Sequence, residues 1–302
     1  MERNFGEVIT AMVTPFKKDL TVDFEALEKL SNHLAKNGSD SILVAGTTGE
    51  CPTLTHEEER EVFKCVQNTV KGTNVKVILG AGSNCTQTAI EASREAEKLG
   101  ADGILTVVPY YNKPSQKGMM LHFGSIAQAV DLPIILYNIP GRTGVNMQPK
   151  TVAELAEKYP NIIALKQSNS DLDLISDVKS LCPKDFIIYS GDDSLTLPML
   201  ALGVEGVISV ASHVIGNEIK EMIKLFKQGN VQEALNLHLK MYPLFRKIFF
   251  APNPIPMKQI LSDLNIMENH LRAPLTELSE SEKEELRAVY KATISSLNKS
   301  AV

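Results

Sequence analysis

The chain has 302 residues, 43% of them hydrophobic, and a formal net charge of −5. A chain of this length and composition can bury a large core, either as one α/β barrel or as two ordinary domains. Lysine and arginine are scattered among aspartate and glutamate without a basic stripe or an aromatic platform, which argues against nucleic acid as a partner.

Eight short apolar runs rich in valine, isoleucine and leucine follow one another along the chain. Each run is typical of a strand that is buried on both faces. In chain order they are residues 8–12, 42–44, 75–79, 103–107, 134–137, 162–165, 186–189 and 204–210.

Segments with helical periodicity lie between these runs. The first repeats apolar residues from Phe24 to Leu34 and stops at Gly38. The second opens at Thr55, where Thr55 and Glu58 fit a capping box. We therefore interpret the acidic residues around Glu58 as helix-start electrostatics, with catalysis as the weaker interpretation.

Buried strands that alternate with amphipathic helices predict a parallel sheet covered on its faces. Eight such units favour a closed (β/α)8 TIM barrel, with an open doubly wound sheet as the alternative. We predict a barrel catalytic domain at residues 1–216. Residues 217–302 predict a helical extension packed on the barrel, with helices at 218–226, 231–245 and 281–297.

Functional groups of a barrel lie at the carboxyl ends of its strands. Here those ends carry hydroxyls, phenols, one arginine and one lysine, which would converge on one face. The segments are 46–50 (Gly-Thr-Thr-Gly-Glu), 109–112 (Pro-Tyr-Tyr-Asn), 137–144 (Tyr-Asn-Ile-Pro-Gly-Arg-Thr-Gly), Lys166, 190–193 (Ser-Gly-Asp-Asp) and 208–210 (Ile-Ser-Val).

Lys166 is the most informative of these residues, because it closes the apolar run 162–165 and is followed by polar residues. An ammonium group in such a place loses hydration, which favours the neutral amine. A neutral amine can attack a carbonyl and form a Schiff base, so Lys166 suggests carbonyl condensation or cleavage. The structural alternative is a strand-end lysine paired with a carboxylate such as Asp171.

The other strand-end groups fit a keto-acid site. Thr47 and Thr48, in a turn that Gly46 and Gly49 would let close tightly, could bind a carboxylate through amides and hydroxyls. Tyr137 could carry protons to and from a carbinolamine, with Thr47 as a relay. Arg142 offers a planar fork for a second carboxylate. Their structural alternatives are an ordinary turn, a core tyrosine and a surface ion pair.

Nothing in the sequence favours a metal, a nucleotide, a disulfide framework or a membrane. The cysteines and histidines lack Cys-x-x-Cys and His-Glu-x-x-His spacing, and residues 80–85 begin like a dinucleotide fingerprint but end in Cys85. Asp192 and Asp193 would repel a phosphate. No signal core or bilayer-length apolar run is present, so we expect a cytoplasmic protein.

Five segments together resemble the 4-hydroxy-tetrahydrodipicolinate synthase family, formerly called dihydrodipicolinate synthase, over nearly the whole chain. They are 46–50, 110–114 (Tyr-Tyr-Asn-Lys-Pro), 137–144, Lys166 and 253–256 (Asn-Pro-Ile-Pro). The resemblance implies a class I aldolase-type lyase of the diaminopimelate and lysine pathway. Such an enzyme condenses pyruvate with L-aspartate 4-semialdehyde and needs no cofactor.

The resemblance also implies a role for each matching residue. Lys166 would form the imine with pyruvate, in a pocket lined by Thr48, Ile208 and Gly191. The proton relay would consist of Tyr137, Thr47 and Tyr111, and Arg142 would hold the carboxylate of the semialdehyde. In this family the tyrosine that matches Tyr111 reaches into the site of a neighbouring subunit. The resemblance therefore implies an oligomer, most often a homotetramer.

Two alternatives to the synthase stay open at this point. N-acetylneuraminate lyases and 2-keto-3-deoxy sugar-acid aldolases share the lysine, the tyrosine and a similar turn, but a polyol substrate would need hydrogen-bonding groups where Arg142 stands. A keto-acid-binding regulator without turnover would require a missing catalytic group, and none is missing.

Lysine inhibition is where the sequence departs from the family pattern. Asn84, Tyr110 and His56 match positions that line the effector site of lysine-inhibited members. Glu59, Thr88 and Cys51 do not match that pattern. Thr88 replaces an acidic residue, and losing a charge-assisted hydrogen bond costs roughly 1.5–3 kcal/mol. We therefore predict weak or absent inhibition by lysine.

Overall fold

A computed structural model describes residues 4–298. Its eight strands follow one another in chain order in a closed barrel, which confirms the predicted fold. Each strand lies within two residues of its predicted position. The strands are β1 (Val8–Ala11), β2 (Ser41–Val44), β3 (Lys76–Gly80), β4 (Gly103–Val107), β5 (Ile134–Asn138), β6 (Ile162–Gln167), β7 (Ile187–Ser190) and β8 (Gly206–Ser209).

Helices alternate with these strands and continue after β8. They are α1 (Phe24–Lys36), α2 (His56–Thr69), α3 (Thr86–Lys98), α4 (Gln116–Ala127), α5 (Pro140–Thr143), α6 (Pro149–Lys158), α7 (Leu172–Leu181), α8 (Thr196–Leu200), α9 (Ser212–Lys227), α10 (Val231–Lys247), α11 (Ile255–Asp263) and α12 (Glu280–Asn298). Single 3₁₀ turns lie at Cys51–Thr53 (η1) and Asp193–Leu195 (η2). No helix within residues 4–298 has the length and apolar character needed to cross a bilayer.

The three predicted C-terminal helices are present as α9, α10 and α12, and α11 is an addition. The sequence did not predict α11 because proline occurs twice at its start, at Pro254 and Pro256. Proline is tolerated in the first turn of a helix, where its missing N–H has no helical acceptor. The two prolines therefore mark the beginning of α11 and do not break it.

The described chain forms two compact units. The first consists of residues 4–6 with Lys76–Ile208, and the second consists of Glu7–Val75 with residues 209–298. The first unit contains β3 to β8 and α3 to α8, and the second contains β1, β2, α1, α2 and α9 to α12. The boundary between barrel and extension at residue 216 stays a prediction.

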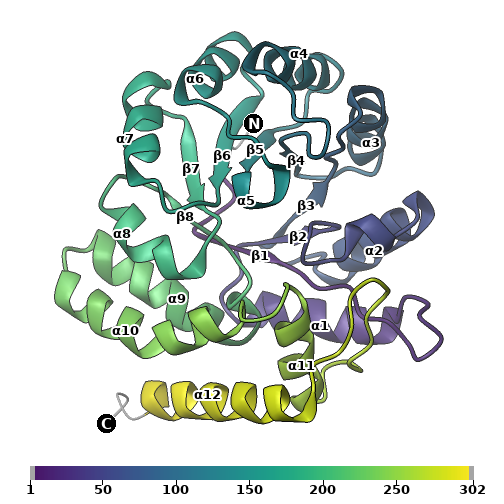
Figure 1. Ribbon diagram of the computed structural model, residues 1–302, viewed down its shortest axis with the longest axis vertical. Helices are drawn as coiled ribbons and strands as arrows, with labels where there is room; N and C mark the ends of the chain where they lie inside the picture. The colour runs from purple at the N-terminus through teal and green to yellow at the C-terminus, as the bar shows by residue number, and fades with distance from the viewer. Residues whose placement is uncertain (1–3, 299–302) are drawn as a thin grey trace. The chain divides into compact units, whose positions relative to one another are not determined.

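In the first unit, parallel pairing aligns the ends of the strands that carry polar residues. Tyr137 on β5 is opposite Lys166 on β6, which in turn is opposite Tyr189 on β7. Helices α3, α4, α6 and α7 lie on the outer side of these strands (Figure 1). Because parallel strands share a direction, their carboxyl ends meet at one edge.

In the second unit, α1 begins at the N-cap Asp23, whose carboxylate accepts a hydrogen bond from the amide of Ala26. Helix α2 has the predicted capping box between Thr55 and Glu58, which confirms the helix-start interpretation of the acidic run. Helix α12, yellow in Figure 1, packs against α10 and α11. These contacts bring the C-terminal segment against other parts of the same unit.

Two glycines let α9 approach the end of α1 closely. A Cβ atom on Gly216, in α9, would lie 2.1 Å from the carbonyl oxygen of Asn37. A Cβ atom on Gly38 would lie 2.6 Å from the carbonyl carbon of Gly216, and Gly38 also has a positive φ of 86°. No real side chain fits at such distances, so both positions require glycine.

We predict that Gly216→Ala destabilises the protein even though alanine is the better helix former. The added methyl group would push against backbone and should cost about 1–3 kcal/mol. Gly141→Ala is the matched control, because nothing lies within 4 Å of a Cβ atom there. Urea denaturation should show a lower midpoint for Gly216→Ala alone. Equal midpoints for the two variants would contradict this packing.

Candidate active site

Lys166 lies at the end of β6 with only 7% of its surface exposed. Its Nζ atom is 4.3 Å from the centroid of the Tyr137 ring, on the neighbouring strand β5. The face of an aromatic ring stabilises a nearby cation electrostatically, but by less than the hydration that the cation loses on burial. The structure therefore brings two of the predicted site residues together around a buried amine.

The environment of Lys166 increases the share of neutral amine. The pKa of Lys166 is lowered to about 8, mainly by burial; the carboxylate of Asp193 opposes the shift and the positive charge of Arg142 adds to it. With a pKa of about 8, roughly a tenth of the amine is neutral at pH 7, against less than about one part in a thousand for an ordinary lysine. Lys166 is thus available as a nucleophile near neutral pH.

The carboxylate that acts on Lys166 is Asp193, which had no assigned role in the sequence analysis. Asp193 is buried at the start of η2, directly after β7. Asp171, the partner considered for a structural salt bridge, instead accepts a hydrogen bond of 3.0 Å from the amide of Leu174 and caps α7. The position of Asp193 after a predicted strand could have indicated a role at the site, but it was interpreted only as repelling a phosphate.

Gly191 lies directly beside Lys166. A Cβ atom on Gly191 would be 1.8 Å from Oγ of Ser168 and 3.0 Å from Cε of Lys166. A side chain at this position would therefore collide with Ser168 and press against Lys166. Oγ of Ser168 is buried and has no hydrogen-bond partner among the described residues. Sequence reasoning missed Ser168, and Ile208, a predicted lining residue, is buried on β8.

Arg142 is exposed in the single-turn helix α5, which follows β5. The turn is closed at its C-terminal end, because Gly144 has a left-handed conformation and its amide bonds to the carbonyl of Pro140. The side chain of Asn138, at the end of β5, donates to Asn146 at 2.7 Å and to Gln167 at 3.0 Å. These bonds fix the loop that presents the guanidinium group.

The two tyrosines after β4 are directed toward solvent. Tyr111 is 90% exposed and Tyr110 is 42% exposed. Tyr111 has a positive φ of 71°, which is uncommon for a bulky residue. An exposed aromatic side chain in a strained loop is typical of a contact or functional position. Within one chain, the phenol of Tyr111 faces water.

The turn that carries Thr47 and Thr48 belongs to the second unit and follows β2. Its left-handed residues are Ala45 (φ 51°) and Glu50 (φ 57°). We expected Gly46 and Gly49 to let this turn close tightly, and neither of these glycines has a positive φ. The positive φ at Glu50 is maintained by the contacts of its own side chain. Gly49 is needed for space, because a Cβ atom there would lie 3.2 Å from the carbonyl oxygen of Met12.

Thr48 is buried, and its hydroxyl oxygen accepts a hydrogen bond of 2.8 Å from Nδ2 of Asn253. Thr47 is half-buried in the same turn. Asn253 belongs to a motif of the family resemblance and had no predicted role. The contact joins residues about two hundred positions apart, so no local pattern could have predicted it.

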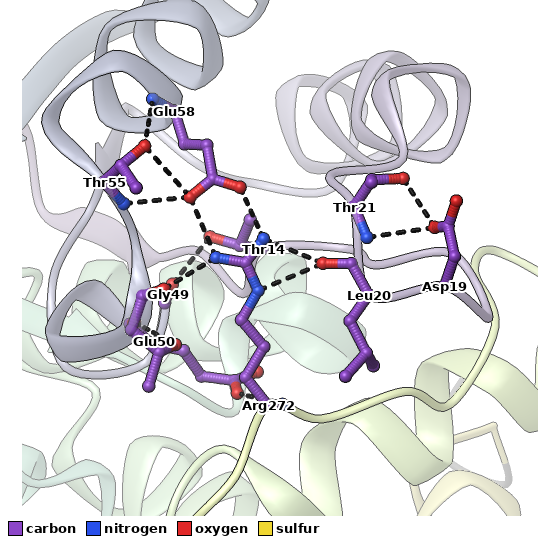
Figure 2. Close-up of polar contacts among 10 residues, drawn as sticks. Thr14, Asp19, Leu20, Thr21, Gly49, Glu50, Thr55, Glu58 and Arg272 are labelled. Carbon is purple, nitrogen blue, oxygen red and sulfur yellow. Dashed lines mark hydrogen bonds and ion pairs between the residues drawn. The ribbon is translucent and has the colours of Figure 1, made fainter.

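Glu50 closes the turn through contacts of its carboxylate, of which Figure 2 shows the one to Arg272. Its carboxylate forms an ion pair with Lys258, and the two side chains are 1% and 0% exposed. It also accepts a hydrogen bond of 3.1 Å from the backbone amide of Arg272. The guanidinium group of Arg272 donates to the carboxylate of Glu58 and to the carbonyl of Leu20. Burial lowers the pKa of Lys258 to about 8, while Glu50 opposes that shift.

In the part of the chain that the structure describes, no three histidine, cysteine, aspartate or glutamate side chains come together as metal ligands. The groups that do converge in the first unit are an amine, a phenol, a carboxylate and a guanidinium group. This combination can form an imine, move protons and bind an anion. It is the chemistry of a keto-acid lyase.

A model of the dihydrodipicolinate synthetase family matches residues 4–293. The chain belongs to this family. The 4-hydroxy-tetrahydrodipicolinate synthase of Thermosynechococcus vestitus is 52% identical over 287 residues, which cover 95% of this chain and 96% of that protein. The enzyme of the same name from Desulforamulus reducens is 48% identical over 286 residues, which cover 95% and 96%.

Solved structures agree with these relatives. The crystal structure of the Cyanidioschyzon merolae enzyme, described with lysine bound, has a TM-score of 0.94 and 52% identity. It covers 96% of this chain, which covers 98% of it. These matches confirm the family and fold that the sequence predicts. They also confirm its enzyme class, the class I aldolase-type synthases of lysine biosynthesis.

The residues predicted for the family's effector site lie in both units. In the first unit, the carbonyl of Asn84 accepts a hydrogen bond of 2.8 Å from Asn112, which ties it to the loop of Tyr110. In the second unit, His56 begins α2 and lies 3.0 Å from the carboxylate of Glu59. Asn84 and His56 thus each have a defined contact within their own unit. Whether they bind an effector stays a prediction.

We predict opposite effects from the two charges near Lys166. Asp193→Asn removes the carboxylate that favours the ammonium form, so the pKa of Lys166 should fall further. Arg142→Leu removes a positive charge that disfavours the ammonium form, so the pKa should rise. The pH at which the imine-forming rate with pyruvate is half-maximal should move down in the first variant and up in the second. Shifts in the same direction would contradict the assignment of these charges.

Proposed function

We propose that this chain condenses pyruvate with L-aspartate 4-semialdehyde, the reaction of a 4-hydroxy-tetrahydrodipicolinate synthase in lysine biosynthesis. The observation that carries the proposal is the buried amine of Lys166, beside Tyr137, in a family member about half identical to synthases over 95% of its length. The proposed site of action is the cytoplasm.

Imine formation begins at the neutral amine. Nζ of Lys166 attacks the keto carbon of pyruvate, and the resulting carbinolamine loses water to give an iminium ion. The iminium draws the electron pair of a methyl C–H bond when a base removes the proton, which yields an enamine. The burial that lowers the pKa of Lys166 favours the first step.

Carbon–carbon bond formation follows from the enamine. Its terminal carbon attacks the aldehyde carbon of the semialdehyde, and the aldehyde oxygen takes a proton. The amino group of the semialdehyde then attacks the iminium carbon, which closes the ring and releases Lys166. In this proposal, the protons pass through Tyr137, Thr47 and Tyr111, whose hydroxyls can both donate and accept.

Binding of the two carboxylates uses different groups. In the proposal, Thr48 and its turn hold the carboxylate of pyruvate, and Gly191 and Ile208 shape the pocket. Arg142 holds the carboxylate of the semialdehyde, because an exposed guanidinium can form a bidentate pair as the substrate enters. The exposed position of Arg142 and the close approach of Gly191 to Lys166 support these roles.

A homotetramer completes the proposed site. Tyr111 is 90% exposed in a strained loop, which supports a role against a second copy of the chain. A solved structure 40% identical to this chain is described as a monomeric dihydrodipicolinate synthase variant. Sedimentation of the purified protein at assay concentration distinguishes the two states. A monomer with full activity would remove Tyr111 from the proposed relay.

The reaction is tested by NADPH consumption with pyruvate, the semialdehyde and an excess of the reductase that acts on the product. Wild-type protein should turn over, and Lys166→Ala should lose at least about a thousandfold in rate because the nucleophile is absent. Lys184→Ala, a change at an exposed lysine, is the matched control. No turnover by well-folded wild type would direct the search to sialic-acid and keto-deoxy-sugar cleavage.

We also expect weak inhibition by lysine, with half-inhibition above about 1 mM. Thr88 offers no carboxylate to an amino group, and its hydroxyl and amide instead lower the pKa of the Cys85 thiol. Losing a charge-assisted bond weakens binding about tenfold or more. Thr88→Glu should therefore increase sensitivity in a lysine titration. Sub-millimolar inhibition of the wild type would refute the expectation. The Cyanidioschyzon merolae enzyme, whose structure is described with lysine bound, is the reference for this titration.

A further inference from the structure

The segment from Asn253 to Arg272 holds the turn 46–50 at two points, both within the second unit. At the first point, the side chain of Asn253 donates to the hydroxyl of Thr48. At the second point, Lys258 and the backbone amide of Arg272 hold the carboxylate of Glu50. The two contacts lie on either side of Gly49.

The first contact sets the direction of the Thr48 hydroxyl. A hydroxyl group has one hydrogen to donate and lone pairs to accept with. Nδ2 of Asn253 occupies a lone pair of Thr48 Oγ1 at 2.8 Å. The hydrogen of Thr48 is therefore left to be donated elsewhere. A carboxylate can only accept hydrogen bonds, so this is the arrangement that a keto-acid carboxylate requires.

The second contact fixes the backbone of the turn. Glu50 has a left-handed conformation, which a residue with a long side chain adopts only where its surroundings enforce it. Lys258 is fully buried, donates to the carbonyl of His270 at 2.8 Å and lies 4.1 Å from the ring centroid of Phe16. If Glu50 moved away, Lys258 would be left as an uncompensated buried charge.

We propose that Asn253 and Lys258 are positioning residues for the keto acid: Asn253 turns the Thr48 hydroxyl into a donor, and Lys258 fixes the turn through Glu50. Neither residue touches the substrate. The inference deepens the proposed function and rests on it, because it assumes that Thr48 binds the carboxylate of pyruvate. The C-terminal segment thereby contributes to substrate affinity as well as to packing.

Pyruvate titrations quenched with borohydride test the Asn253 step, since reduction fixes the imine at Lys166 and intact mass reports its occupancy. Asn253→Ala should raise the half-saturating pyruvate concentration about three- to tenfold, the loss expected for one hydrogen bond. Asn253→Asp should raise it more, because a carboxylate would accept the Thr48 hydrogen and repel the substrate. The occupancy at saturating pyruvate should stay unchanged in both variants.

A double-mutant cycle separates positioning from general loosening. In a Thr48→Val background, Asn253→Ala should change the half-saturating concentration by less than about twofold, because the two residues act as one unit. Asn236→Ala, at an exposed position on α10, is the matched control and should behave like wild type. Additive effects of Thr48→Val and Asn253→Ala would overturn the Asn253 step, as would an unchanged titration of Asn253→Ala.

The Lys258 step is tested with the neutral pair Glu50→Gln and Lys258→Met in one chain. Removing both charges avoids a stranded buried ion, so this variant should unfold at a denaturant midpoint near that of wild type. Its half-saturating pyruvate concentration should still rise severalfold because the turn is no longer held. A half-saturating pyruvate concentration equal to that of wild type would overturn the Lys258 step. Wild-type protein that forms no imine at all would overturn the proposed function itself.

Discussion

The amine of Lys166 is removed from water at the end of β6, between the strands that carry Tyr137 and Tyr189. Burial of an ammonium group is costly, and here the cost appears as a pKa of about 8. Asp193 limits this shift and Arg142 increases it, so the lysine keeps a balance between its charged and neutral forms. That balance is what imine chemistry at neutral pH requires.

Lys258 shows what makes Lys166 different. Both lysines are buried and both have a pKa lowered to about 8. Lys258 is paired with Glu50 and bonded to the carbonyl of His270, so its charge is used to hold other groups. Lys166 instead faces the ring of Tyr137 and lies close to Gly191. A perturbed pKa alone would not separate a structural lysine from a nucleophilic one, and the neighbouring groups do.

The sequence predicted much of the fold because its signals are local. Continuous apolar runs placed all eight strands, and Thr55 with Glu58 placed the start of α2. The position rule for barrel strands also selected Lys166, Tyr137 and Arg142 from the residues themselves. The resemblance to a known family added the substrates and the individual roles, which spacing alone could not supply.

What the sequence could not predict depends on contacts between distant segments. The left-handed conformation of Glu50 follows from Lys258 and Arg272, more than two hundred residues away. The hydrogen bond from Asn253 to Thr48 likewise joins two distant segments of the chain. Asp193 was visible at a strand end, but its effect on Lys166 became clear only when both were seen to be buried in one unit.

The most direct test of the account is to reduce the protein with borohydride in the presence of pyruvate, digest it and locate the modified lysine by mass spectrometry. A single pyruvate-derived adduct is expected, on the peptide that contains Lys166. An adduct on Lys258 or on another lysine, or no adduct in active protein, would contradict it.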